Sequence, residues 1–204
     1  MTDFRSSTED PVDARHWSRV LTRYRAPDPV RSVLELIVTL APFFAIWAVA
    51  WLVLSYSIAL AVVLALANAA FLVRLFMIQH DCGHASFFRS KRLCNWLGRA
   101  IGVVTLTPYD VWRETHAIHH ASTGNLDRRG IGDLPTLTVA EYRAKGPVGR
   151  GLYRLVRHPL FLFAIVPFYS FFLQNRLPVG LMRSGWKYWL SAMATNAAIA
   201  AILT

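Results

Sequence analysis

Two short stretches concentrate histidine in this chain. They read HDCGH over residues 80–84 and HAIHH over residues 116–120, so five of the seven histidines lie within residues 80–120. Residues three or four apart share one face of a helix, so each stretch can aim its imidazoles at one point. Neutral imidazole is the most common metal-binding side chain, and it suits iron, zinc and copper better than magnesium or calcium. The predicted metal ligands are His80, His84, His116, His119 and His120.

Three carboxylates lie close in sequence to these histidines. Metal-bound histidines commonly donate their second ring N–H to a carboxylate, so we expect Asp81, Asp110 and Glu114 to act as outer acceptors. The two remaining histidines, His16 and His158, stand alone and are interpreted as ordinary surface or turn residues.

Two apolar runs precede the histidines and must position them. Residues 33–55 carry one charge, Glu35, and residues 57–79 are interrupted only by Asn68 and Arg74. At about 1.5 Å per residue each run reaches roughly 35 Å, which exceeds a hydrocarbon core of about 30 Å. The short break between the runs predicts an antiparallel hairpin. The first histidine stretch would then lie where the second helix leaves the membrane.

Composition agrees with a membrane protein. Hydrophobic residues make up 54% of the 204 residues and charged residues 17%, against about 45–50% apolar and 25% charged in soluble domains. This hydrophobicity excludes global disorder. The two cysteines lack CxxC spacing, which excludes a zinc ribbon or a thioredoxin-type site. A net charge of +10 suits nucleic acid or an anionic bilayer; the apolar runs favour the lipid bilayer, with no nucleic-acid partner.

The distribution of basic residues predicts the topology. Residues 32–73 contain no Lys or Arg, so the positive-inside rule places both ends of the hairpin in the cytoplasm. We predict an all-α integral membrane protein with its active-site side cytoplasmic. Its expected parts are a cytoplasmic N-terminal segment (1–32), a transmembrane hairpin (33–79), a cytoplasmic metal-binding helical cap (80–150), an interfacial or re-entrant segment (151–185) and the start of a further transmembrane helix (186–204).

The two histidine stretches resemble the first two histidine boxes of the membrane fatty acid desaturases, which read H-x3-H or H-x4-H and H-x2-HH. The sequence HDCGH at residues 80–84 is similar to the first histidine box of the subclass that acts towards the methyl end of an acyl chain (Δ12 or ω3 type). The resemblance covers roughly residues 30–175. It implies two iron ions on the cytoplasmic side of a four-span helical bundle, held in part by the five histidines.

The same resemblance implies an activity and its partners. Members of the family use dioxygen to introduce a double bond into an acyl chain. The implied substrate is an acyl-lipid, an acyl-CoA or an acyl-carrier conjugate. The implied electron donor is a ferredoxin or a b-type cytochrome.

One feature of the family pattern is missing. A third H-x2-HH box follows much later in the family, whereas here only His158 follows His120. Two irons need more nitrogen ligands than five histidines supply. We therefore expect an N-terminal portion of a desaturase, with an incomplete four-span bundle, an incomplete iron site and impaired activity as it stands.

Three other functions remain open at this point. A di-iron membrane hydroxylase or ketolase shares the histidine spacings. An intramembrane zinc peptidase would use HDCGH as an H-[acid]-x-x-H motif with Asp81 as general base. A non-catalytic metal-binding membrane fragment would pair with a chain that supplies the missing ligands.

Overall fold

The computed structural model describes residues 17, 20–22, 26–134 and 136–204 of the chain. Most of the predicted N-terminal segment, residues 1–32, lies outside these ranges. Within them the regular structure is helical and no residue belongs to a β-strand. The predicted all-helical fold class is therefore confirmed for the described part of the chain.

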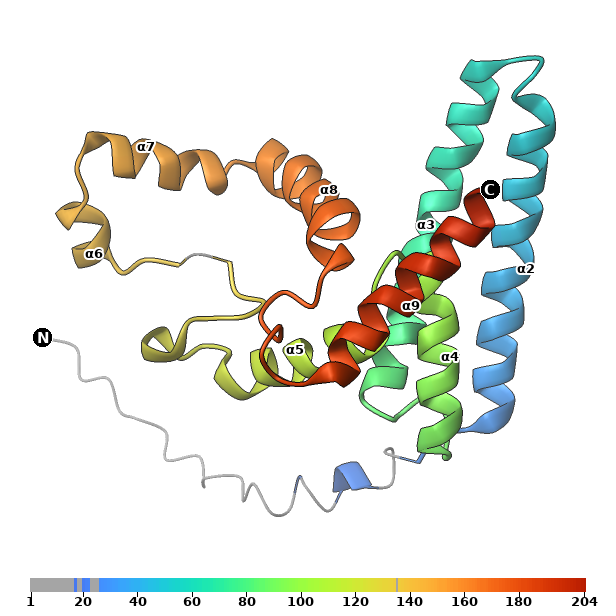
Figure 1. The fold of residues 1–204 in the computed structure, drawn as a ribbon, viewed down its shortest axis with the longest axis horizontal. Coiled ribbons are helices and arrows are strands. Elements are labelled where there is room, and N and C mark those ends of the chain that lie inside the picture. The colour runs from blue at the N-terminus through green and yellow to red at the C-terminus, as the bar shows by residue number, and fades with distance from the viewer. Residues whose placement is uncertain (1–16, 18–19, 23–25, 135) are drawn as a thin grey trace, which may run out of the picture.

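The predicted hairpin is formed by α2 (Pro29–Val53) and α3 (Ile58–Gly83), which run antiparallel along one side of the molecule (Figure 1). Both are long and apolar enough to cross a membrane, and each contains an 18-residue stretch with a mean hydropathy of 2.3. The side chains of Asp28 and Ser57 accept hydrogen bonds from the first turns of the two helices. Helix α3 extends past residue 79, so His80 lies on its last turn.

Polar contacts join the two helices of the hairpin across their shared face. The guanidinium of Arg74 lies 2.6 Å from a carboxylate oxygen of Glu35 and donates to the hydroxyl of Thr39 at 3.3 Å. The amide nitrogen of Asn68 donates to the carbonyl of Phe43 at 3.2 Å. Polar groups in apolar surroundings need such partners, so these contacts fix the pairing of α2 with α3.

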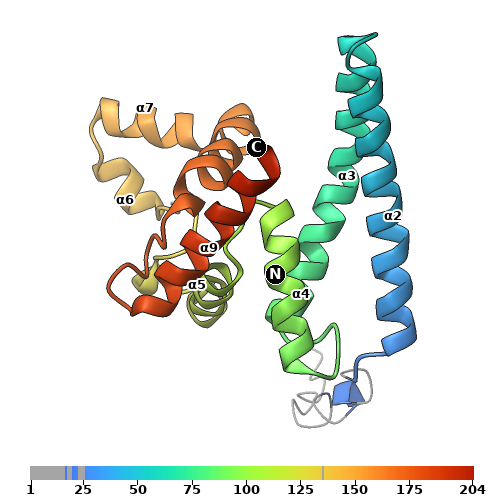
Figure 2. The same ribbon diagram turned by 45° about the vertical axis from the view of Figure 1, so that its right-hand side comes forward.

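A second layer consists of α4 (Lys91–Val104), α5 (Tyr109–Ser122) and α9 (Trp186–Leu203), which lie on one side of the hairpin, with α4 next to α3 and α9 beyond α4 (Figure 2). Two glycines on α4 allow the close approach of α5. A Cβ added at Gly98 would overlap the ring of Tyr109, and one added at Gly102 would overlap the backbone carbonyl of Thr107. The Gly-xxx-Gly spacing therefore serves to bring α5 against α4.

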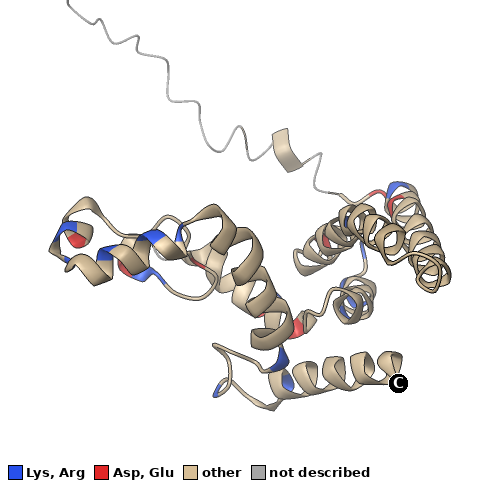
Figure 3. Cartoon of the chain, turned by 90° about the horizontal axis from the view of Figure 1, so that it is seen from above, with Lys and Arg blue, Asp and Glu red and all other residues tan. Residues whose placement is uncertain are grey.

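An arm of short helices lies to the side of this bundle (Figures 1 and 2). Two of them are α6 (Val139–Ala144) and α7 (Pro147–Val156), which carry Arg143, Arg150 and Arg154. Figure 3 colours the basic and acidic residues along the cartoon of the chain. The helical segment Phe161–Arg176, which contains α8 (Val166–Phe168), follows α7 at a bend of 57°. By length and composition this bent pair could count as a third span. Pro167, which cannot donate a backbone hydrogen bond, lies between its two π-helical stretches.

We predict that Gly98→Ala destabilises the chain by about 1–3 kcal/mol, because the new methyl group displaces the ring of Tyr109 in a packed interface. The matched control is Gly151→Ala in α7, where nothing lies within 4 Å of the added carbon. That variant should be neutral or gain up to about 1 kcal/mol from helix propensity. Unfolding of the purified chain in detergent measures both. Equal stability of the two variants would contradict the close packing of α4 on α5.

Candidate metal centre

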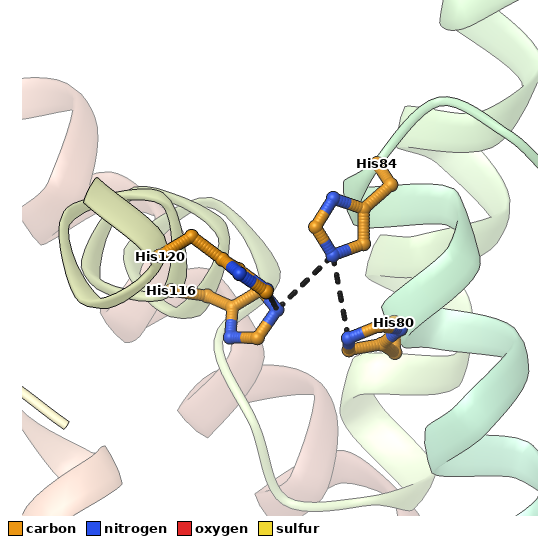
Figure 4. A group of neighbouring side chains, drawn as sticks. All are labelled: His80, His84, His116 and His120. Carbon is orange, nitrogen blue, oxygen red and sulfur yellow. Dashed lines mark hydrogen bonds between the residues drawn. The ribbon is translucent and has the colours of Figure 1, made fainter. Parts of the chain in front are cut away.

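Four of the five predicted ligands meet at the base of the hairpin. His80 and His84 come from the end of α3, and His116 and His120 from one face of α5 (Figure 4). The Nε2 atoms of neighbouring rings lie close together. The distances are 3.3 Å between His80 and His84, 3.2 Å between His84 and His116, and 3.0 Å between His116 and His120. One ligand atom from each of the four lies within 4.8 Å of the others.

Three of these spacings match those around a single metal ion. Four nitrogens at about 2.0–2.1 Å from a tetrahedral ion lie about 3.3 Å from one another, close to the three successive separations, and all four nitrogens lie within 4.8 Å of one another. A neutral imidazole carries one N–H and one lone pair, so four converging ring nitrogens bring several lone pairs together. A cation among them turns this crowding into coordination. An all-imidazole donor set suits iron, zinc or copper.

The surroundings of two of the imidazoles favour their neutral form. Partial burial, reinforced by the neighbouring histidines, lowers the pKa of His116 to about 4. Burial and the imidazole of His80 also lower the pKa of His84. Desolvation and nearby positive charge both disfavour imidazolium. At neutral pH these rings therefore keep a lone pair available for a metal.

An aromatic wall holds the ring of His116. Trp112, one turn earlier on α5, stacks on it with the ring centroids 4.6 Å apart and the planes inclined by 15°. Trp112 also meets the ring of Phe76 edge to face, with the centroids 5.5 Å apart. A Cβ at Gly83 would come within 2.7 Å of the indole, so α3 approaches this wall closely. The wall fixes the direction of His116 and makes one side of the site apolar.

The end of α3 fixes the position of His84. The N–H of Ala85 donates to the carbonyl of Cys82 and the N–H of Ser86 donates to the carbonyl of Asp81, both at 3.0 Å. These two bonds form a Schellman motif, which ends the helix directly after His84. The motif requires a left-handed residue, and Ala85 takes this position with φ of 53°. A non-glycine residue there costs about 1–2 kcal/mol.

Helix α4 ends in the same way. Leu106 has φ of 55°, and the N–H of Thr107 donates to the carbonyl of Gly102 at 2.7 Å. The carbonyl of Leu106 accepts hydrogen bonds from Arg176 at 2.6 Å and Asn175 at 3.2 Å. Contacts from much later in the chain therefore secure the corner between α4 and α5.

The fifth predicted ligand, His119, does not join the group of four. The centroid of its ring lies 6.3 Å from that of His116 and 6.0 Å from that of His120. Its Nδ1 lies 2.9 Å from a carboxylate oxygen of Asp133. Sequence reasoning missed Asp133. The available signal was the turn Gly130-Ile131-Gly132-Asp133, which follows the second histidine stretch closely.

The three expected outer carboxylates have different surroundings. A carboxylate oxygen of Asp81 lies 3.3 Å from Nδ1 of His80, the nitrogen opposite the converging Nε2 atoms. Asp110 instead accepts two hydrogen bonds from Arg99, at 2.8 and 3.1 Å. Glu114 lines a cavity between α4, α5 and α9.

Comparison with known proteins gives the family. The profile of the family described as "Fatty acid desaturase" matches residues 56–204. The chain belongs to the fatty acid desaturase family. This agrees with the resemblance carried by the histidine stretches, and with the hairpin and histidine group described above.

Two relatives define the extent of the likeness. A fatty acid desaturase of Bacillus subtilis is 40% identical over 191 residues, which are 92% of this chain and 54% of the relative. An sn-1 acyl-lipid omega-3 desaturase (ferredoxin) of a Synechocystis species is 53% identical over 53 residues, which are 26% of this chain and 15% of the relative. The chain thus spans about half the length of the first desaturase. No solved structure matches the chain.

We predict that Ala85→Gly stabilises the chain by up to about 1 kcal/mol, because glycine relieves the left-handed strain that alanine bears there. The control is Ala197→Gly, an exposed position inside α9, which should cost about 1 kcal/mol. Thermal unfolding in detergent compares both with the parent chain. A loss of stability in Ala85→Gly would contradict the strained end of α3.

Proposed function

We propose that residues 1–204 carry the first two histidine boxes of a membrane desaturase that uses iron and dioxygen to introduce a double bond into an acyl chain. The observation that carries this proposal is the convergence of four histidine Nε2 atoms at one end of the hairpin. Membership of the desaturase family supports the same conclusion.

Within this proposal the five histidines hold iron, four through the group in Figure 4 and His119 beside it. Bound iron would supply the activation of dioxygen that removes two hydrogens from an unactivated chain. The protein orients the ligands: the Schellman turn holds His84, and Trp112 holds His116. The stacked indole also gives the site an apolar side, and such a side keeps water from the reacting carbon.

The substrate and the electron donor are proposed by analogy with the relatives. One of them is named an sn-1 acyl-lipid desaturase that uses ferredoxin. We infer an acyl chain carried on a membrane lipid and a ferredoxin-type donor for this chain as well. A substrate dissolved in the bilayer suits a site at the end of two spanning helices.

The histidine group is proposed to face the cytoplasm. Residues 32–73, which include the tip of the hairpin, contain no Lys or Arg, whereas basic residues follow α3 densely from Arg89 onward. The positive-inside rule assigns such an end to the cytoplasm. This is also the compartment of soluble reduced electron carriers.

The two-iron centre is proposed to need ligands from outside residues 1–204. Five histidines provide too few nitrogens for two irons. His158 contacts the backbone of its own turn, where its Nδ1 accepts from the N–H of Leu160 at 3.3 Å. The 204 residues alone would therefore bind metal yet show little or no desaturation.

The first test measures metal binding by the purified 204-residue chain. We expect cobalt(II) or iron(II) to bind, and His116→Ala to weaken binding by more than the roughly 10–100-fold that loss of an outer partner costs. His158→Ala is the matched control and should leave binding unchanged. Titration followed by absorption and by metal content gives both results. A parent chain that binds no metal, or equal binding in the two variants, would remove the four-histidine site.

The second test asks for the reaction. Residues 1–204 are joined to the remaining C-terminal part of the Bacillus subtilis relative and expressed in a bacterium that makes no polyunsaturated lipid, together with a ferredoxin and its reductase. We expect lipids with a new double bond, lost in His116→Ala and retained in His158→Ala. Gas chromatography with mass spectrometry identifies the product. A hydroxylated product, or an iron-loaded chimera without product, would overturn desaturation.

A further inference from the structure

The loop after the second histidine stretch is fastened around His119. Gly132 has φ of +84°, a conformation that L side chains rarely adopt, and a Cβ on it would lie 3.2 Å from the Cβ of His119. The side chain of the next residue, Asp133, is oriented by its own loop, because one carboxylate oxygen accepts a hydrogen bond from the N–H of Gly130 at 3.2 Å. The other oxygen lies 2.9 Å from Nδ1 of His119. One carboxylate oxygen is therefore held by the turn while the other lies next to the imidazole.

This loop is also anchored from outside. Arg129, just before it, binds both carboxylate oxygens of Glu141 at 2.8 and 3.0 Å. Ile131 packs against Gly180, at whose position a Cβ would come within 2.9 Å of the isoleucine side chain. Anchors on both sides keep Asp133 in place, with its side chain only 22% exposed.

The imidazole of His119 has two different environments. Its Nδ1 is buried and has no aligned hydrogen-bond acceptor among the described residues. The carboxylate of Asp133 at 2.9 Å is therefore the group that a small rotation of the ring would engage. Its Nε2 lies 3.2 Å from the hydroxyl of Thr123, which itself donates to the carbonyl of His119 at 2.7 Å. Thr123 thus keeps a partner if Nε2 moves away.

We infer that Asp133 is a positioning residue for His119, which it holds by Nδ1 so that Nε2 is the nitrogen offered to a metal ion. This inference rests on the proposed iron-binding function. A carboxylate on one ring nitrogen selects the tautomer and the orientation in which the other nitrogen binds metal. Asp133, rather than Asp110 or Glu114, is then the carboxylate that accepts the second ring N–H of a histidine in residues 116–120.

The test is a double-mutant cycle on metal affinity in the 204-residue chain. Cobalt(II) is titrated into the parent chain, Asp133→Asn, His119→Ala and the double variant, with Asp127→Asn as a control in the same loop. We expect Asp133→Asn to weaken binding roughly 10–100-fold and to change the visible spectrum of bound cobalt. The same substitution should have no further effect in His119→Ala. Asp133→Glu should recover part of the affinity, and Asp127→Asn should match the parent.

The outcomes separate the two proposals. If the parent chain binds no cobalt, the proposed metal-binding function fails and this inference fails with it. If the parent binds and Asp133→Asn binds equally well, the function stands and Asp133 has no positioning role. An equal loss in the parent and His119→Ala backgrounds means a merely structural effect, which also overturns the inference. Circular dichroism checks that each variant is folded.

Discussion

The structure depends on the close approach of four imidazoles that come from two different helices. Successive Nε2 atoms lie 3.0–3.3 Å apart. One N–H per neutral ring can link some of these pairs by a hydrogen bond, and the lone pairs that still face one another gain nothing without a cation. The surrounding packing must therefore impose the arrangement. The glycine face of α4 lets α5 come near, Trp112 fixes one ring by stacking, and the abrupt end of α3 fixes another. Within the hairpin, the ion pair between Glu35 and Arg74 and the hydrogen bond from Asn68 to the carbonyl of Phe43 keep α3 in register with α2.

Much of this arrangement could be predicted from the sequence because it follows from strong periodic signals. Long apolar runs with a short break specify a hairpin, and the i, i+4 pairs specify which histidines share a face. The position of His119 could not be read in this way. At 100° per residue, His119 lies 60° to one side of His116 and His120 lies 40° to the other, so the helix period alone does not decide whether His119 joins the other two. Its partner is set by the loop that carries Asp133, and loop positions have no period to read.

Electrostatics explains why the expected outer carboxylates behave differently from one another. Asp110 lies in the first turn of α5, opposite Arg99 on α4, and a bidentate guanidinium is a stronger partner than a neutral imidazole. Asp81 follows His80 directly, so it reaches the outer nitrogen of that ring. Asp133 lies further away in sequence but is less exposed than Asp81, at 22% against 52% of the side chain. Proximity along the chain was therefore a weak guide, because the tertiary path of the chain brings Asp133, and not Asp110 or Glu114, next to an imidazole of the second histidine stretch.

The strained corner at Leu106 has a consequence for the order in which the protein is assembled at the ribosome. Its carbonyl is held by Arg176, and the same guanidinium donates to the side chain of Asn196 at 2.8 Å. The second histidine stretch is therefore synthesised some sixty to eighty residues before the contacts that fasten its helix are available. Until then the turn bears its backbone strain without this support.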